Sequence, residues 1–446
     1  MHLLGPLFAL FVVATERAGL RRWAFYGGLT LIAFLVALLV YAYLPLRSRA
    51  DPAVDWGNPE TLSNWWAVVR RSQYNFMLTQ YPRGWARFAR QMQAMGGLWS
   101  REFTPVLGMV GAAGLLVLLR RHFWYTLWLV AAGLYLVVAF TVAQNFNLDK
   151  EWLWVMSVFG IPAYLIMAMG IGGVLGLVQR WLGRWAAGAA ALICIAVPLV
   201  NHWEHNDKSD YYWAEDYGRN TLESLPPNAL YFPGPDHASF SALYLQVVEG
   251  LRPDVTLGRK YGYLDLPEAP ELRDKFGEFP RRRDEPEILG WYLTHTERPA
   301  YFSDYVRLAG APGVRLVSAG LLCRAVRPGE TRETRDDWAE YRWHTLAPGD
   351  TRGDYTAELI LYEIDYARAR EAMARGQYAA GLAALDRGLS RYGREYTVLN
   401  NAGVLCARFG QRAAARMYFE EALRLPGQDG ATRENLQGLQ ELLSQP

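Results

Sequence analysis

The first side chain with recognisable chemistry is Arg47, in the segment Tyr43-Leu44-Pro45-Leu46-Arg47-Ser48. A charge-free stretch precedes it, so we expect Arg47 where a helix leaves a bilayer. A guanidinium there can pair with a phosphate through two parallel, charge-assisted hydrogen bonds. It can equally be an interfacial anchor whose side chain only reaches the lipid head groups. The motif leaves both interpretations open.

A second group of polar and aromatic residues follows in the same loop. It comprises Asp55-Trp56-Gly57-Asn58-Pro59 and, further on, Arg70-Arg71-Ser72-Gln73-Tyr74. A tryptophan beside carboxylate and amide groups can hold a sugar by ring stacking and hydrogen bonding. Asp, Gly, Asn and Pro also build turns, so a purely structural role is equally consistent. The candidates for binding a donor or substrate are Asp55, Trp56, Arg70, Arg71 and Tyr74.

Two further carboxylates occupy positions where ligands often bind. Asp149 lies in the polar turn Phe146–Trp152 between two apolar stretches, where it could orient a substrate or cap the next helix. Asp236 follows a predicted strand and precedes a predicted helix, a common place for ligand groups in α/β folds. Pro235 stands where a phosphate-binding loop needs glycine, so we expect Asp236 to be a helix N-terminal neighbour and not part of a nucleotide site.

Other chemistries find little support in the sequence. His202, Glu204, His205 and Asp207 resemble metal ligands, but their spacing is irregular and we predict no metal site. The chain has three cysteines and no CxxC pair, and it lacks a P-loop, a GxGxxG unit and a Ser-His-Asp set. With 46 Lys and Arg against 44 Asp and Glu, the net charge of +2 argues against nucleic acid as a partner.

The first part of the chain has the pattern of a membrane bundle. Charge-free stretches cover Trp23–Leu44, Phe103–Leu119, Phe123–Phe146, Trp152–Val178 and Trp185–Val200. Most approach or exceed the ~20 residues that a membrane-crossing helix needs. We therefore predict a multi-pass transmembrane bundle over residues 1–202, with a large extracytoplasmic loop at 45–104.

Arginines in the short connections set the orientation. They cluster at Arg17, Arg21 and Arg22, at Arg120 and Arg121, and at Arg180 and Arg184. The positive-inside rule places these three connections in the cytoplasm. The loop at 45–104, the turn at 147–151 and everything after His202 are then extracytoplasmic, in a protein of the cytoplasmic membrane. Because successive spanning helices alternate in direction, the same orientation places Met1 outside. We therefore expect further helices upstream, and the chain is then a truncated product or a fragment.

The remainder, from Asp207 onward, has the composition of a soluble protein in two parts. Over residues 207–345 we predict a small α/β domain. Its strands are Ala229–Phe232, Asp254–Leu257, Ala300–Ser303 and Val314–Val326, and Ser239–Gly250 is a helix. Over residues 355–446 we predict tetratricopeptide-like helical repeats. A shift of 34 residues superimposes Asp365–Arg394 on Leu399–Gln428 and aligns small residues, such as Gly388 with Ala422. A helix at Thr432–Leu443 would cap them.

Read together, these segments resemble the transmembrane O-mannosyltransferase-like family, glycosyltransferase family 117. The resemblance lies in YLPLRSRADPAVDWGNPETLSNWWAVVRRSQY, in NFNLDKEWLW and in LPPNALYFPGPDHASFSALYLQVVEGLRPDV. In the last segment Asp236, Phe240, Tyr244-Leu245-Gln246 and Arg252-Pro253-Asp254-Val255 match the family motif, while Pro235, His237 and Ala238 depart from it. The resemblance runs from about Tyr41 to the C-terminus, and Arg252, Asp254 and their neighbours are its most specific part.

The resemblance implies a partial GT-C-like bundle that transfers a mannose-like sugar from a polyprenyl-phosphate donor to an extracytoplasmic acceptor. No other cofactor is implied. The family's catalytic acid lies in an Asp-Ser-Gly-Glu stretch followed by His-Pro-Pro-Gly, and this sequence contains neither. The catalytic half is thus expected upstream, and Arg47, Asp55, Arg70, Arg71 and Tyr74 would shape the donor pocket. The alternative is a non-catalytic membrane scaffold whose repeats bind a protein partner.

Overall fold

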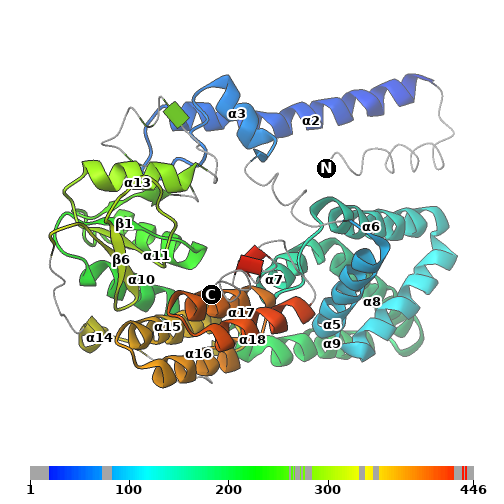
Figure 1. Cartoon of the computed structure of the whole chain (residues 1–446). Helices are drawn as coiled ribbons and strands as arrows, with labels where there is room; N and C mark the ends of the chain where they lie inside the picture. Colours follow the sequence, from blue (N-terminus) through cyan, green and yellow to red (C-terminus); the bar gives the residue numbers. More distant parts are fainter. Residues whose placement is uncertain are drawn as a thin grey trace. The chain divides into compact units, whose positions relative to one another are not determined.

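A computed structural model describes residues 20–72, 83–260, 263–264, 266, 272, 275–276, 284–330, 337–344, 351–425, 434–435 and 437–438. Over these residues the protein is mostly helical and carries a small mixed sheet (Figure 1). The chain divides into two compact units, Met1–Asn206 and Asp207–Pro446. We call them the N-terminal unit and the C-terminal unit, and describe each by itself.

The described part of the N-terminal unit contains five helices that are long and apolar enough to cross a membrane. They are α2 (Leu20–Ser48, spanning part Ala24–Ser48), α5 (Trp85–Arg121), α6 (Phe123–Gln144), α8 (Ile161–Leu182) and α9 (Arg184–Asn206). Two shorter helices, α3 (Leu62–Val69) and α7 (Lys150–Phe159), lie between them in the sequence. In the length and apolar composition of its helices, the structure confirms the prediction of a multi-pass helical membrane protein.

Two helix boundaries differ from the sequence prediction. Helix α5 begins at Trp85, inside the predicted loop, and changes direction at Thr104, whose φ of 57° and ψ of 157° are not helical. Pro105 explains this break, because proline disfavours the helical conformation in the residue before it. The charge-free stretch Trp152–Val178 is divided at Gly160 into α7 and α8, and a proline occupies the first turn of α8.

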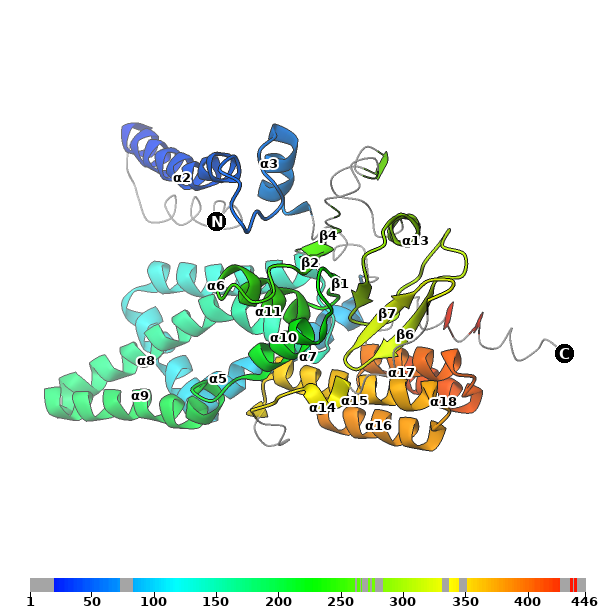
Figure 2. The ribbon, with the colours of Figure 1, turned by 90° about the vertical axis from the view of Figure 1, so that its left-hand side faces the viewer.

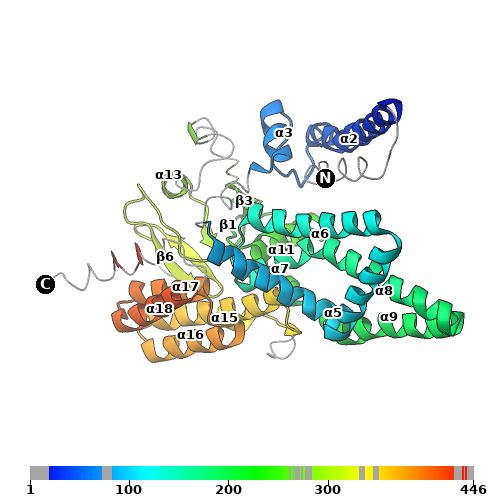
Figure 3. The ribbon, with the colours of Figure 1, turned by 90° about the vertical axis from the view of Figure 1, so that its right-hand side faces the viewer.

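Helices α5 and α8 pack together without intervening side chains. Gly111 and Gly114 of α5 face Gly170 and Gly173 of α8, and a Cβ placed on Gly114 would collide with the carbonyl oxygen of Gly170. Small residues allow such close backbone approach in membrane helices. Figure 3 shows α5, α6 and α8 running alongside one another, with α9 against α8. This packing fixes the ends of the helices that carry the polar residues described below.

The C-terminal unit is built on a five-stranded sheet with the order β2-β1-β5-β7-β6. Its strands are β1 (Leu230–Phe232), β2 (Thr256–Leu257), β5 (Ala300–Phe302), β6 (Arg315–Ala319) and β7 (Leu322–Val326). Strand β1 pairs in parallel with both β2 and β5, whereas β7 is antiparallel to β5 and β6. A separate pair, β3 (Arg259–Lys260) and β4 (Tyr263–Leu264), is antiparallel. The predicted single strand Val314–Val326 is wrong, because Gly320, with φ of 56°, turns it into the β6–β7 hairpin.

Helices cover both faces of this sheet. One face packs on α10 (Trp213–Ser224), α11 (Asp236–Val247) and α15 (Tyr355–Ala374), and the other on α13 (Glu285–His295). The short helix α14 (Asp337–Glu340) lies beside α10. All three residues of β1 are buried, as expected for a central parallel strand covered on both sides. Helix α11 starts three residues before the predicted Ser239, at Asp236.

Four helices form two antiparallel hairpins in the C-terminal unit (Figure 2). Helix α15 packs on α16 (Tyr378–Tyr392), and α17 (Tyr396–Arg408) packs on α18 (Arg412–Arg424). Aligned small residues are buried in both hairpins, among them Gly388 and Ala422. Their identity as tetratricopeptide repeats stays a prediction, and the capping helix predicted from Thr432 lies largely outside the described residues. Because α15 also packs on β6, the sheet and the hairpins form one unit.

Candidate functional site

The loop after α2 is a hydrogen-bonded structure centred on Ser48. The Ser48 hydroxyl is buried and donates to the Asp55 carboxylate at 2.6 Å. Asn58, with φ of 38°, accepts from the Asn64 side chain through its carbonyl oxygen at 2.9 Å. The Trp65 indole donates to the carbonyl oxygen of Tyr41 at 2.7 Å and so attaches α3 to α2. Asp55 therefore has the turn-building role that its neighbours allow, and its role in sugar binding stays a prediction.

The cationic and aromatic candidates of this loop are at the surface. Arg47, Arg70 and Arg71 are exposed, and Trp56 keeps 39% of its surface accessible. The Arg70 guanidinium lies 4.5 Å from the ring centre of Trp66. At this distance the aromatic face attracts the cation. Arg71 adopts φ of 54° at the end of α3. Tyr74 lies outside the described residues.

A polar turn joins α6 to α7 and is fastened to the first turns of α5. Asn145 ends α6 in the left-handed conformation, with φ of 49°. Arg87 of α5 donates to the Asn145 side-chain oxygen at 3.0 Å and to the Phe146 carbonyl oxygen at 2.8 Å. Gln91, which is buried, donates to the same carbonyl at 2.6 Å. Two polar side chains of α5, which is distant in the sequence, thus satisfy the carbonyl oxygen of Phe146 in this turn.

Asp149 closes the turn from the other side. One carboxylate oxygen accepts from the Trp152 amide at 3.0 Å, and the other accepts from the Asn147 side chain at 2.9 Å. Burial raises the pKa of Asp149, although these hydrogen bonds oppose the shift. The predicted capping role is confirmed. Asn147 is buried and its side-chain oxygen has no hydrogen-bond partner, so the turn offers one unused acceptor.

An apolar groove of about 520 Å³ lies between α5, α8 and α9. Its walls are Phe103, Leu107, Ala168, Ile171, Gly172, Leu175, Ala191, Cys194, Ile195 and Pro198. Two polar residues, Glu102 and Tyr164, complete the lining, and the buried Tyr164 hydroxyl has no hydrogen-bond partner. Sequence reasoning missed this groove, because helix pairing and not residue type creates it.

Arg252 and Asp254 form a structural clamp in the C-terminal unit. Arg252, at φ of 49°, donates to the carbonyl oxygens of Leu222, Leu225 and Pro226 at 2.8, 2.7 and 3.0 Å. It also forms a two-pronged ion pair with Asp254, which lowers the pKa of that carboxyl. Asp236 and Phe240 lie exposed on α11 and do not join this clamp.

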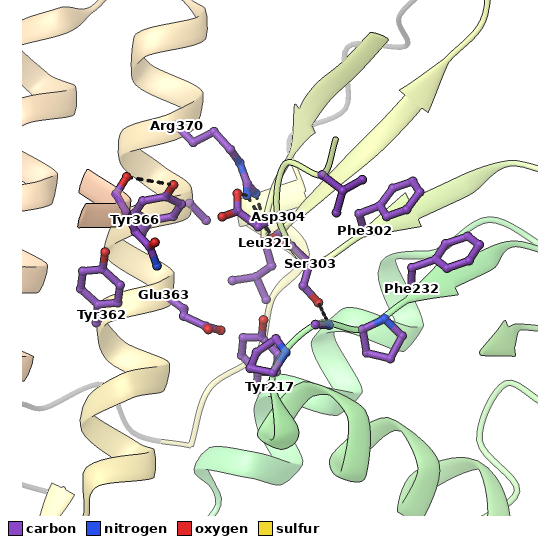
Figure 4. A pocket seen from close by; sticks show the side chains of 16 residues that line it. Tyr217, Phe232, Phe302, Ser303, Asp304, Leu321, Tyr362, Glu363, Tyr366 and Arg370 are labelled. Carbon is purple, nitrogen blue, oxygen red and sulfur yellow. Dashed lines mark hydrogen bonds and ion pairs between the residues drawn. The ribbon is translucent and has the colours of Figure 1, made fainter. Parts of the chain in front are cut away.

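A second cavity, of about 140 Å³, lies in the C-terminal unit between the sheet and α15 (Figure 4). Pro233–Pro235 follow β1 and line one side together with Ser303 and Asp304, which follow β5. Helix α15 supplies the opposite wall, with Tyr362, Glu363, Tyr366 and Arg370. Ser303 is held in place by the Gly234 amide at 3.1 Å, and its hydroxyl also contacts the Tyr231 hydroxyl at 3.1 Å.

Charged groups of opposite sign line this cavity. Asp304 lies 3.3 Å from the Arg370 guanidinium, and Glu363 contacts the His237 ring at 2.8 Å. Burial raises the pKa of Asp304, Arg370 opposes that shift, and the charge of Glu363 adds to it. Asp304 could have been predicted from its place after a strand. Glu363 and Arg370 could not, since they lie some sixty residues further along the chain.

Metal ligation finds no support among the described residues, where no group of three or more His, Cys, Asp or Glu side chains is placed to hold an ion. The candidates therefore fall into three places: the loop and polar turn of the N-terminal unit, its apolar groove, and the cavity of the C-terminal unit. No family model and no solved structure matches this chain.

Proposed function

We propose that this protein takes part in sugar transfer from a polyprenyl-phosphate donor at a membrane, as the resemblance to the O-mannosyltransferase-like family implies. The observation that carries the proposal is the groove between α5, α8 and α9. Its walls are almost entirely apolar, and Glu102 and the unpaired Tyr164 hydroxyl are the polar groups in it. An isoprenoid chain is an apolar ligand, and it can pack against such walls in place of lipid acyl chains.

Helix α5 contributes both to the polar turn, near its start, and to the groove, near its middle. Glu102 lies 11 residues after Gln91, which at 1.5 Å per residue corresponds to ~16 Å of helix, less the effect of the break at Thr104. A lipid-linked sugar lying in the groove would extend its polar end toward the turn. There the partly exposed carboxylate of Asp149 could bind a sugar hydroxyl group.

Arginine placement supports the extracytoplasmic side for this chemistry. If the five candidate helices of the described residues each cross the membrane, the connections at Arg120–Arg121 and Arg180–Arg184 lie on one side. The loop after α2, the polar turn and the start of the C-terminal unit then lie on the other. The exposed Arg47 and Arg70 in that loop could contact the donor phosphate.

Photo-crosslinking of the full chain in nanodiscs tests the proposal. The probe is a polyprenyl-phosphate mannose with a benzophenone on its lipid, and the variant is Gly172→Leu. Gly172 lines the groove and a Cβ there meets nothing within 4 Å, so the larger side chain fills the groove without disturbing the helix. Gly176→Leu is the matched control, because Gly176 also has open space around it and does not line the groove.

We expect Gly172→Leu to lower crosslinking about tenfold, and Gly176→Leu to leave it unchanged. Equal labelling of both variants would contradict the proposal, as would an unlabelled wild-type chain. A second assay measures the transfer of radiolabelled mannose to an acceptor by membranes that contain the full chain.

A partner-binding scaffold is the second candidate, and one surface favours it. Helix α18 carries a shallow surface depression in which Met417 keeps 49% of its surface accessible among charged side chains. The other residues of that surface are Ala413, Arg416, Glu420, Glu421 and Arg424. The predicted tetratricopeptide identity of the hairpins would make such a face a place for a peptide or helix of a protein partner. An unlabelled wild-type chain in the crosslinking experiment would favour this candidate.

A further inference from the structure

The cavity of the C-terminal unit occupies the position where open α/β sheets bind ligands. Strand β1 has parallel neighbours on both sides, β2 and β5. From β1 the chain crosses through α11 to β2 on one side, and from β5 it continues to β6 and β7 on the other. The connections after β1 and β5 therefore diverge and leave a crevice at the carboxyl ends of the two strands. The cavity lies in this crevice and is independent of the groove in the N-terminal unit.

The volume of the cavity limits the size of a ligand. A cavity of ~150 Å³ holds one benzene molecule, and this one measures about 140 Å³. A bound molecule would thus have about six to eight non-hydrogen atoms. A nucleotide or an oligosaccharide is too large to enter it as a whole.

The guanidinium of Arg370 does not offer a site for an anion. It donates to the carbonyl oxygens of Gly320, Leu321 and Leu322 at 3.2, 3.0 and 2.9 Å, and its Nε contacts the Ser318 hydroxyl at 3.3 Å. The remaining nitrogen, Nη1, faces Asp304 and the Ser303 carbonyl oxygen. Every part of the guanidinium is thus directed at protein oxygens, and Arg370 itself is only 1% exposed.

The two carboxylates, by contrast, remain open to the cavity. Water can reach 46% of the Asp304 side chain and 24% of that of Glu363. Figure 4 shows Asp304 beside Arg370, and Glu363 projecting from α15 toward Tyr217. A carboxylate has about four lone-pair positions. The contacts of Asp304 with Arg370 and the Tyr305 amide, and those of Glu363 with His237 and Tyr217, therefore leave acceptor capacity on both groups. An incoming anion would add a third negative charge, whereas a cation would reduce the repulsion between the two carboxylates.

Tyrosine rings supply the rest of the polar lining. The Tyr362 and Tyr366 hydroxyls are directed at the carbonyl oxygens of Val398 and Asn401, at 3.2 and 3.5 Å, and Tyr217 is buried beside them in the lining. The Tyr217 hydroxyl is hydrogen-bonded to Glu363, so all three rings are held in place by protein oxygens. Aromatic faces attract cations and add to the effect of nearby carboxylates.

We propose that this cavity binds a small organic cation, a primary amine or a guanidinium compound, between Asp304 and Glu363. The ammonium or guanidinium group donates to one or both carboxylates, and the carbon atoms pack against the tyrosine rings and Leu321. The proposal does not depend on sugar transfer, because a different unit and different residues carry it.

Calorimetric titration of the full chain in detergent at pH 8 tests this inference. The probes are 1,3-diaminopropane, ethanolamine and guanidinium. Matched comparisons are 1,3-propanediol, which has the shape of the diamine without its charge, together with mannose and inorganic phosphate. We expect at least one cation to bind and the neutral and anionic compounds not to bind.

Two isosteric variants locate the site. Asp304→Asn and Glu363→Gln keep the shape of the side chains and remove one charge each. We expect each to weaken binding of the cation about tenfold, the effect of losing one charge-assisted contact. Glu420→Gln is the control, because Glu420 pairs with Arg416 on α18 and is not part of this cavity. Using two variants keeps the test valid if one of them fails to fold.

Each outcome decides the matter. Cation binding that both variants weaken and Glu420→Gln does not would support the proposal. Binding of propanediol or mannose as strongly as the amines would overturn the cationic class. Absence of any binding, or binding that folded Asp304→Asn or Glu363→Gln protein retains in full, would overturn the site. None of these results bears on crosslinking of the lipid probe to the N-terminal unit.

Discussion

Arg252 and Asp254 form a two-pronged ion pair although only one residue separates them: Nε lies 2.9 Å from Oδ1 and Nη2 lies 2.8 Å from Oδ2. The remaining guanidinium bonds reach the three carbonyl oxygens at the end of α10. The positive φ of Arg252 turns its side chain back toward them. A short sequence motif thus joins the end of one helix to the start of a strand.

Removing this guanidinium should destabilise the C-terminal unit. We expect Arg252→Ala to lower the free energy of unfolding by about 3 kcal/mol, because charge-assisted hydrogen bonds are lost and buried carbonyl oxygens stay unpaired. Arg252→Lys should recover only part of the loss, because an ammonium cannot reproduce the fork. Hydrogen exchange of the amides at residues 222–225 in the full chain would measure this loss of stability. Protection equal to that of the wild type in Arg252→Ala would contradict the structural role.

The same pair predicts an acid-sensitive contribution to stability. The folded state holds the pKa of Asp254 below its ordinary value of 3.8. The ionised carboxylate therefore stabilises the fold at pH values above about 4, and this contribution is lost as the pH falls below that value. The melting temperature of the wild type should thus fall more steeply than that of Asp254→Asn as the pH is lowered from 5 to the lowest pH at which the chain stays folded. If the melting temperatures of the two proteins changed in parallel with pH, Asp254 would make no such contribution to stability.

Close packing of α5 on α8 makes the glycines there intolerant of larger side chains. Gly114→Leu should destabilise the N-terminal unit by about 3 kcal/mol or more, because the new side chain collides with the backbone of Gly170 and the helices must separate. Gly176→Leu on α8, where a Cβ meets nothing within 4 Å, should behave as wild type. The thermal melting of the two variants in detergent measures the difference. Similar melting temperatures would show that α5 and α8 do not pack through these glycines.

Asp149 should contribute to α7 chiefly through its cap. We expect Asp149→Ala to cost about 1 kcal/mol, and Asp149→Ser to recover most of it, because a hydroxyl can also accept from the Trp152 amide. Exchange of the amides at 150–153 would report the cap. If Asp149 also orients a sugar, Asp149→Ser should restore amide protection without restoring mannose transfer. Loss of protection in Asp149→Ser would indicate a role beyond capping.

The sequence predicts the elements better than their boundaries. Apolar stretches of sufficient length identify the spanning helices, and turn residues around Leu230 identify β1. The hairpin at Gly320 was missed because Val314–Val326 is mostly apolar on both sides of the turn, and a single glycine does not distinguish a turn from a strand. The break in the long apolar stretch at Gly160 has the same cause. Periodicity shows where apolar residues lie but not where the chain changes direction.

The candidate sites divide along similar lines. Asp149 and Asp55 lie where the sequence places them, because helix ends and turns are local features. The groove and the cavity depend on pairs such as Gly114 with Gly170 and Asp304 with Arg370, which lie 56 and 66 residues apart in the sequence. A single sequence has no signal for such pairs. The family resemblance located Arg252 and Asp254, but only the structure shows the clamp they form.

The contacts of Arg370 bear on whether the helical hairpins of the C-terminal unit can be separated from its sheet. Its guanidinium, carried by the first helix of the hairpins, satisfies backbone oxygens of the β6–β7 turn and faces Asp304 after β5. A chain cut between the sheet and α15 would leave those oxygens unpaired and the Asp304 carboxylate without its counter-ion. The hairpins should therefore not be transferable as an independent module, and a protease nick near residue 345 should leave the two pieces associated until both unfold in a single transition.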